Sequence, residues 1–258
     1  MRTALRWVVV AYLVLLVASH IVRRLPREPA ATPEGLATLE LAERRGVEAG
    51  DGTLAITYRQ WAPPIPAEAP GDVLLLHGSP GSSRDFATLG PALGERYRVI
   101  APDLPGFGGS TKEVPDYSIR AHAAYSLEML DRLGIDQAHL VGFSMGGGVA
   151  LEMIRQAPQR ASSLTLLSAI GVQELELLGN YSLNHAVHGF QLACLWLTQE
   201  ALPHFGLLDD AFFGVPYARN FYDSDQRPLR QVLEGLEVPT LILHGEHDLL
   251  VPVEAAHE

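Results

Sequence analysis

One serine lies among four glycines at the point where an apolar stretch changes into a helical pattern. The segment GFSMG (142–146) follows a short apolar run and precedes two further glycines. A serine hydroxyl in such a place can attack a carbonyl carbon, provided that a base takes its proton and N–H groups stabilise the oxyanion. The strand-to-helix turn must be tight, and any side chain larger than hydrogen at the flanking glycines would crowd it. Ser144 is therefore predicted to be a nucleophile.

The elements that would position Ser144 follow a repeating order of apolar run, glycine- or proline-rich turn and helical pattern. Continuous apolar runs of this length are typical of strands that are buried on both faces. A helix is expected over 118–134, with Ser118 as its N-cap and Gly134 at its end. The order predicts an α/β fold: a mostly parallel central sheet with helices on both faces and functional residues at the carboxyl ends of the strands. The expected strands are 54–61, 72–78, 97–106, 139–144, 163–169 and 239–245.

The stretch 172–237 interrupts this order, because it has no convincing strand but many apolar and aromatic residues. We expect a helical cap inserted over the strand ends. Most of its aromatic residues would form the core of the cap itself, and a minority would line a pocket.

Four stretches together resemble one family. GFSMG (142–146) matches a nucleophile elbow, HGSPGSS (77–83) matches an oxyanion loop, and LHGEHDLLVP (243–252) matches the strand end that carries an acid. APDLPGFGGS (101–110) matches a further loop. Over roughly residues 50 to 258 the chain resembles the cap-bearing branch of the α/β-hydrolase superfamily, with a serine nucleophile.

The resemblance implies a role for each candidate residue. Ser144 would attack the substrate, and the backbone N–H groups of Met145 and Ser79 would form the oxyanion hole. Asp248 would hold the imidazole of the base, with Glu246 as the weaker candidate for this role. His77 and Asp103 are interpreted as structural residues. No cofactor and no metal ion are expected.

The catalytic histidine is the part of the pattern that is not found. In the family it follows the acid by a few tens of residues, whereas ten residues follow Asp248 here. We therefore expect a domain that is incomplete at its C-terminus, with the histidine beyond Glu258. The histidines that are present are each interpreted as structural: His122, His139, His185, His188, His204, His244, His247 and His257.

A serine nucleophile favours the hydrolysis of carboxylic esters or thioesters through an acyl-enzyme. It argues against dehalogenases and epoxide hydrolases of the superfamily, which need a carboxylate nucleophile. An apolar cap beside a membrane anchor suggests an apolar or lipid-derived ester. The expected cap has nine acidic residues and three arginines, which disfavours strongly anionic substrates such as coenzyme A thioesters. Two alternatives stay open. One is a hydrolase of C–C bonds, and the other is a non-catalytic binding module with the same fold.

The N-terminus predicts a second kind of partner. Residues 7–22 carry no charged side chain and are flanked by arginines on both sides, which favours a transmembrane anchor over 1–28. A cleaved signal peptide and a soluble amphipathic helix are the alternatives, and the side of the membrane is not decided. A linker is expected over 29–50 and the hydrolase domain over 51–258. The net charge of −11 argues against nucleic acid as a partner, and the single cysteine, Cys194, excludes an intrachain disulfide.

Overall fold

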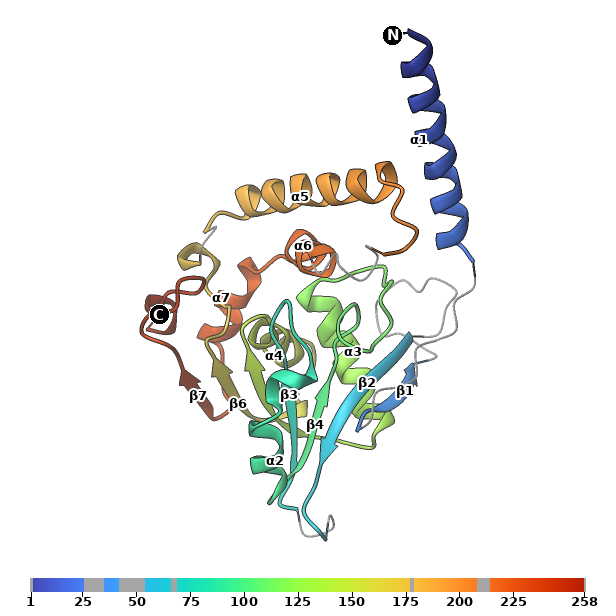
Figure 1. Cartoon of the computed structure of the whole chain (residues 1–258). Coiled ribbons are helices and arrows are strands. Elements are labelled where there is room, and N and C mark those ends of the chain that lie inside the picture. Colours follow the sequence, from blue (N-terminus) through green and yellow to red (C-terminus); the bar gives the residue numbers. More distant parts are fainter. Residues whose placement is uncertain are drawn as a thin grey trace.

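The computed structural model describes residues 2–25, 35–41, 54–65, 69–176, 179–207 and 214–257. Within these ranges the chain forms a twisted sheet that is covered by helices, with one long helix lying across the top and another standing apart from the domain (Figure 1). Residues 29–34 and 42–50 of the predicted linker, and residues 26–28 of the predicted anchor, lie outside the described residues.

The sheet has seven strands in the order β1-β2-β4-β3-β5-β6-β7. The five strands from β4 to β7 are parallel, while β2 pairs antiparallel with both β1 and β4. The predicted α/β fold with a mostly parallel sheet is confirmed. The strands are β1 (Ala37–Leu41), β2 (Leu54–Trp61), β3 (Asp72–Leu76), β4 (Arg98–Pro102), β5 (Ala138–Phe143), β6 (Ala161–Leu167) and β7 (Thr240–Leu243).

Helices cover both faces because the central strands are apolar on both. In β3, Leu74 and Leu76 face one core, and Val73 and Leu75 face another. The first core includes residues of α3, α4 and α7, and the second is covered by α2. The alternation follows from the two-residue period of a strand. The helices are α2 (Leu89–Gly94), α3 (Ile119–Arg132), α4 (Met145–Gln156) and α7 (Arg227–Glu234).

Helix α3 begins and ends as its sequence predicts. The Ser118 side chain accepts a hydrogen bond from Ala121 N–H, and Gly134 has a positive φ of 66° just after the helix. One strand was not expected. β1 lies inside the predicted linker, where the short run from Ala37 to Leu41 alternates apolar and polar residues and pairs with β2. Five residues next to a proline-rich stretch carry too weak a pattern to indicate a strand.

The stretch predicted as a cap contains α5 (Tyr181–Ala201), α6 (Gly214–Asp223) and α7. Helices α5 and α6 pack against each other above the carboxyl ends of the strands (Figure 1). α7 differs from them, because Leu229 is fully buried in the main core and α7 packs on α4. This helix therefore serves as part of the layer that covers the sheet.

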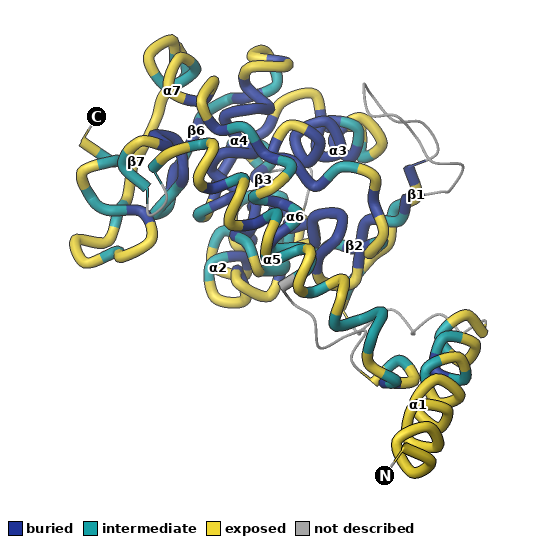
Figure 2. The backbone as a smooth tube through the Cα atoms, turned by 90° about the horizontal axis from the view of Figure 1, so that it is seen from above, coloured by how far each residue is buried: buried dark blue, intermediate teal, exposed yellow. Residues whose placement is uncertain are grey.

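Helix α1 (Arg2–Arg23) stands away from the domain, and almost all of its side chains are exposed. Among the described residues it is the one helix that is long and apolar enough to span a membrane. At about 1.5 Å per residue its 22 residues extend roughly 33 Å, close to the thickness of a bilayer's hydrocarbon core. Only its C-terminal part touches the rest of the protein, near the end of α5 (Figure 2).

Candidate active site

Ser144 sits on a sharply bent backbone between β5 and α4. Its φ of 51° and ψ of −118° are rare for a residue with a side chain, and such a conformation persists only where its surroundings impose it. The surroundings are the two flanking glycines. A Cβ on Gly142 would lie 2.5 Å from Gly146 O, and one on Gly146 would lie 2.0 Å from Leu76 O. The tight strand-to-helix turn that was predicted at Ser144 is therefore present, and the role of Ser144 as a nucleophile stays a prediction.

The loop after β3 lies directly against this elbow. A Cβ built on Gly78 would be 3.2 Å from the Cβ of Ser144, so the backbone of the loop passes within van der Waals contact of the serine. The next residue, Ser79, lines the same cavity as Ser144. Met145 is the first residue of α4, where backbone N–H groups have no partner inside the helix. Neither the Met145 nor the Ser79 N–H has an acceptor among the described residues, as oxyanion donors require.

A buried network holds this loop in place. His77 donates from Nδ1 to Gly78 O (2.7 Å) and accepts at Nε2 from the Leu104 N–H (2.9 Å). Burial lowers the pKa of His77, so the ring is uncharged and matches this pair of bonds. The Asp103 carboxylate accepts from Ser83 N–H, Gly109 N–H and the Thr57 hydroxyl. Both ring nitrogens of His77 and both carboxylate oxygens of Asp103 are hydrogen-bonded within this network, in agreement with the structural roles expected for the two residues.

Asp248 follows β7, at the same edge of the sheet as Ser144. Its Oδ1 accepts from the N–H groups of Leu250 (2.9 Å) and Val251 (3.0 Å). Burial raises the pKa of Asp248, but these two N–H groups, together with His244 and the Ser168 hydroxyl, outweigh it and hold the pKa below its usual value. Asp248 is thus an ionised carboxylate on a fixed turn, and the two residues that hold it reach the Ser144 cavity. Glu246 is exposed and makes no comparable contact among the described residues.

The cavity around Ser144 has a volume of about 80 Å³ and lies between the strand ends and helices α5 and α6. Its wall combines apolar and aromatic groups with a cluster of amides and a carboxyl. The lining residues are Ser79, Ser144, Ile170, Gln173, Glu176, Asn184, His188, Tyr217, Phe221, Gln226, Leu250 and Val251.

Glu176 is the unexpected group in this wall. It accepts from the Gly171 N–H (3.1 Å) and from the Gln226 amide, whose nitrogen lies 2.9 and 2.8 Å from the two carboxyl oxygens in the orientation that satisfies both groups. Burial raises the pKa of Glu176 to about 7. The site therefore contains a carboxyl that is close to half-protonated at neutral pH.

No histidine among the described residues hydrogen-bonds to both Ser144 and Asp248. His188 lines the cavity, but its Nδ1 is bonded to Asn184 O and its ring stacks on Phe221, with 4.9 Å between ring centroids. His244 Nε2 lies 4.0 Å from Asp248 Oδ2 but donates to Val251 O (2.7 Å). The structure thus brings Ser144, Ser79 and Met145 together, places Asp248 nearby, and assigns other contacts to the histidines.

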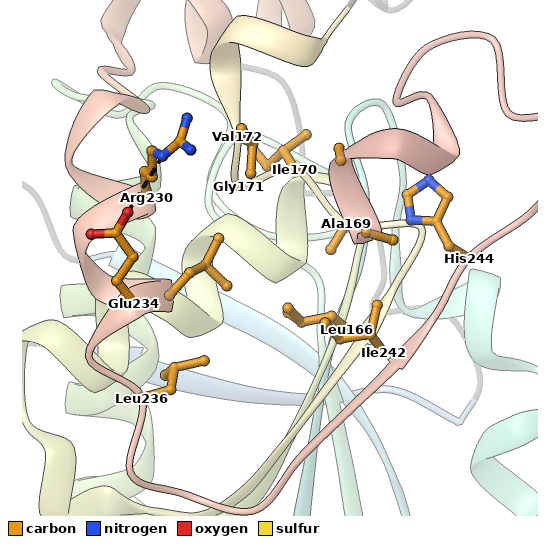
Figure 3. A pocket seen from close by; sticks show the side chains of 13 residues that line it. Leu166, Ala169, Ile170, Gly171, Val172, Arg230, Glu234, Leu236, Ile242 and His244 are labelled. Atoms are coloured by element: carbon orange, nitrogen blue, oxygen red, sulfur yellow. Dashed lines mark ion pairs between the residues drawn. The ribbon is translucent and has the colours of Figure 1, made fainter. Parts of the chain in front are cut away.

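A second, larger cavity lies beside the site and does not share its chemistry (Figure 3). Its volume is about 190 Å³, and it opens between β6, β7 and α7 without including Ser144, Ser79 or Asp248. Its charged groups, Arg230 and Glu234, pair with each other across 3.4 Å. The smaller cavity is therefore the candidate active site, because it contains the strained serine.

Tyr217 and Phe221 belong to the cap aromatics, a minority of which was expected to line a pocket. Four polar residues of the site were not predicted from the sequence: Gln173, Glu176, Asn184 and Gln226. They come from the cap stretch, where no motif marks a functional position. One signal was present. Asn184 and His188 stand four residues apart on a helix that has no acidic residue, lysine or arginine before Glu200, and this spacing puts two polar groups on one side of it.

Known proteins agree with this architecture. Residues 72–190 match the family described as alpha/beta hydrolase fold. The chain is 31% identical over 204 residues to a putative non-heme haloperoxidase of Mycobacterium phage D29, which covers 71% of this chain and 73% of that protein. It is 28% identical over 207 residues to the 2-hydroxymuconate semialdehyde hydrolase of Pseudomonas sp. (strain CF600), with coverages of 71% and 72%.

Solved structures show the same fold. A thermophilic esterase from Thermogutta terrifontis superimposes with a TM-score of 0.61 at 20% identity, over 86% of this chain and 84% of the other. Some relatives are much longer than the matched region, since the chain spans 29% of the length of mycobacterial proteins that are 42% identical to it over 100 residues. The match to the phage protein, together with the elbow and the sheet order, shows that the chain belongs to the α/β-hydrolase superfamily.

Proposed function

We propose that the protein is a membrane-anchored serine hydrolase that cleaves apolar carboxylic esters through an acyl-enzyme. The observation that carries the proposal is Ser144, held in a strained backbone conformation at the wall of a cavity, beside two N–H groups without an acceptor among the described residues. Strain of this kind gathers where a side chain must be presented to a ligand. A serine in a purely structural turn would not need it.

The chemistry follows from these groups. Ser144 Oγ attacks the ester carbonyl, its proton passes to an imidazole, and the N–H groups of Met145 and Ser79 stabilise the oxyanion. Collapse of the tetrahedral intermediate expels the alcohol, which takes the proton, and water then hydrolyses the acyl-enzyme by the same route. Asp248 orients the imidazole and stays ionised, consistent with its lowered pKa. Among the described residues, no imidazole bridges Ser144 and Asp248.

The lining of the cavity supports an apolar substrate. Ile170, Tyr217, Phe221 and Leu250 form most of its apolar wall. Glu176 adds a negative charge as the pH rises past about 7, which disfavours anionic substrates. Helix α1 supports attachment to a membrane, because its exposed apolar surface has no partner in the described part of the domain that could bury it.

Active-site labelling tests the proposal. We expect a fluorophosphonate probe to form an adduct on Ser144 in the full chain, mapped by peptide mass spectrometry, because the trap is irreversible and accumulates even when turnover is slow. Ser144→Ala should abolish it. Ser79→Ala is the matched control, since it removes a neighbouring hydroxyl but keeps the backbone N–H. No adduct on Ser144 in folded protein would contradict the hydrolase and favour a binding module.

A second candidate is hydrolysis of a C–C bond, which the relationship to the 2-hydroxymuconate semialdehyde hydrolase favours. It would use the same serine. A panel of p-nitrophenyl esters, run beside 2-hydroxymuconate semialdehyde itself, separates the two. Turnover of the semialdehyde with no turnover of any ester would replace the ester proposal.

A further inference from the structure

Helix α5 has polar residues on its buried face and apolar residues on its exposed face, the reverse of a surface helix in a soluble domain. Its polar residues Asn184 and His188 face inward and are 5% and 4% exposed. From Tyr181 to Gln199 it has no acidic or basic residue other than two histidines. The side chains on its outer face are apolar, at helical spacing and open to the surroundings: Leu183 (52% exposed), Val187 (42%), Phe190 (73%) and Leu197 (59%).

The apolar surface continues around this stripe. Cys194 is exposed on the same face, and Trp196 is 64% exposed on its flank. Beyond the helix, Leu202 and Leu207 are 47% and 83% exposed. A contiguous apolar surface of this kind marks a binding site on a soluble protein. The question is what covers it.

The contact between α1 and α5 answers this. Tyr12 donates to Ala201 O (2.6 Å), and Ser19, which is fully buried, accepts from Phe205 N–H (2.8 Å). His20 bonds to the Glu200 carboxylate (2.8 Å). These three hydrogen bonds lie between Tyr12 and His20 and fix the direction of α1 relative to α5. The outer face of α5 and the candidate membrane span therefore form one surface.

The direction of this surface suits a bilayer. Helix α5 lies over α6, and the N-terminal half of α1 rises past it on the side away from α6 (Figure 1). The outer face of α5 therefore points the way in which α1 would enter hydrocarbon. Counted from Arg23 at 1.5 Å per residue, the contacting residues lie roughly 5 Å (His20) to 17 Å (Tyr12) along the α1 axis, so the end of α5 would lie between the rim and the middle of the span, at or somewhat below the depth of an interfacial helix.

We propose that α5 lies in the interface of the membrane that α1 spans, with its outer face among the acyl chains, and that lipid esters reach Ser144 from beneath this helix. The inner face of α5 supplies Asn184 and His188 to the Ser144 cavity, so the helix that meets the lipid is also a wall of the site. The docking rests on α1 as an anchor, and the delivery of substrate rests on the proposed hydrolase function.

The single cysteine provides a direct test. Cys194 of the full chain is labelled with an NBD maleimide, and the protein is reconstituted into phosphatidylcholine vesicles that carry doxyl groups on their acyl chains. We expect strong quenching, greatest for doxyl positions near a depth of roughly 5–10 Å. The control is Cys194→Ala combined with Glu95→Cys, which places the label on an exposed residue just after α2, at the opposite end of the sheet (Figure 1). This label should not be quenched.

A charge on the outer face tests delivery separately. Phe190→Glu should weaken the quenching at Cys194 and lower turnover of a long-chain ester in the vesicle by about tenfold, because the new carboxylate must leave the hydrocarbon. Turnover of a short water-soluble ester should not change. Ala92→Glu, an exposed position on α2, is the matched control and should change none of these values.

Each result decides one part of the proposal. Lack of quenching at Cys194 overturns the docking, and a bismaleimide cross-link between two copies through Cys194 would assign the face to a second chain instead. Quenching without hydrolysis of any ester leaves the docking in place and refutes the hydrolase. Equal loss of short and long esters in Phe190→Glu would overturn delivery from the membrane.

Discussion

The backbone around Ser144 is fixed by close contacts with neighbouring backbone segments, whereas helix α5, which faces the same cavity, is buried on one side only. At the elbow, the backbones of Gly142, Gly146 and Leu76 approach so closely that no additional carbon fits. On α5, the inner residues Asn184 and His188 are buried, while Phe190 on the outer side is 73% exposed. Contacts within the protein fix the turn at Ser144, whereas nothing in the described part of the protein covers the outer face of α5.

This difference shows how two kinds of constraint appear in one sequence. A steric constraint acts over a few residues, so a short motif such as GFSMG after a strand is enough to predict the tight turn. An environmental constraint appears only as a mismatch between a helix and its surroundings, and the surroundings must be known before it can be seen. The predictions below test whether the elbow is as rigid and α5 as dependent on a membrane as this contrast implies.

Removing α1 should have the largest effect. The full chain should stay in the membrane pellet through an alkaline carbonate wash, because the insertion of a spanning helix into a bilayer is effectively irreversible. A chain that begins after Leu25 should be largely extracted by the wash but still bind vesicles weakly through α5. Intact-mass analysis of the full chain checks that α1 is retained. A full chain that remains in the supernatant, or that has lost α1 by cleavage, would show that α1 is no anchor.

A carbon added at the elbow should have the next largest effect. Gly146→Ala places a Cβ 2.0 Å from Leu76 O, and neither backbone can move without disturbing the central strands. We expect a loss of about 4 kcal/mol or more in the free energy of unfolding, measured by urea denaturation. Gly245→Ala is the matched control, because its Cβ would meet nothing within 4 Å. Similar stabilities for the two variants would mean that the elbow is no more constrained than an ordinary loop.

Glu176 gives the wall of the Ser144 cavity a pH dependence. Its pKa is raised from 4.5 to about 7, so the folded protein binds its proton more tightly than the unfolded chain does. Stability contributed by this site is therefore present below about pH 4.5 and is lost as the pH rises to about 7, by up to about 3 kcal/mol.

Glu176→Gln keeps the size and the acceptor oxygen but cannot ionise. Its unfolding free energy should change less than that of the unmodified chain between pH 5 and pH 8, as measured by urea denaturation at both values. The exposed neighbour Glu174→Gln is the control and should keep the original profile. Parallel profiles for the unmodified chain and Glu176→Gln would show that the carboxyl is ionised throughout this range.

The sequence predicts the sheet well and the wall of the site poorly, for physical reasons. The expected strand 54–61 has the same bounds as β2, because its apolar pattern and its flanking turns are local signals. Glu176, Asn184 and Gln226 were not predicted, because they meet only when the cap packs on the strand ends. β1 was not predicted because its five residues form a strand through pairing with β2, which a short local pattern does not indicate. The catalytic roles of Ser144, Asp248, Ser79 and Met145 stay predictions until labelling and turnover test them.

The smallest effect is expected for substitutions of His188 and His244, the two histidines near the site. They test whether either residue acts as the general base. Without a general base the Ser144 hydroxyl stays protonated at neutral pH and is a weak nucleophile. His188 and His244 are bonded to Asn184 O and Val251 O, so neither is placed to carry a proton between Ser144 and Asp248. The 258-residue chain should then hydrolyse p-nitrophenyl esters slowly, with a residual acceleration of roughly 10³–10⁴ over water from the oxyanion donors and binding.

On this argument His188→Gln and His244→Gln should each change ester turnover less than about twofold, since the residual rate does not pass through either ring. Ser144→Ala, measured alongside, reports how much of the rate depends on the serine. The pH–rate profile adds a second readout, because a histidine that acts as base produces a rise in rate with pH that its glutamine variant loses. Turnover that is fast and serine-dependent and that His188→Gln abolishes would contradict this expectation. Helix α5 would then supply both a wall of the site and its general base. The elbow and α5 would then be parts of one catalytic unit, and the contrast between them would hold for folding but not for function.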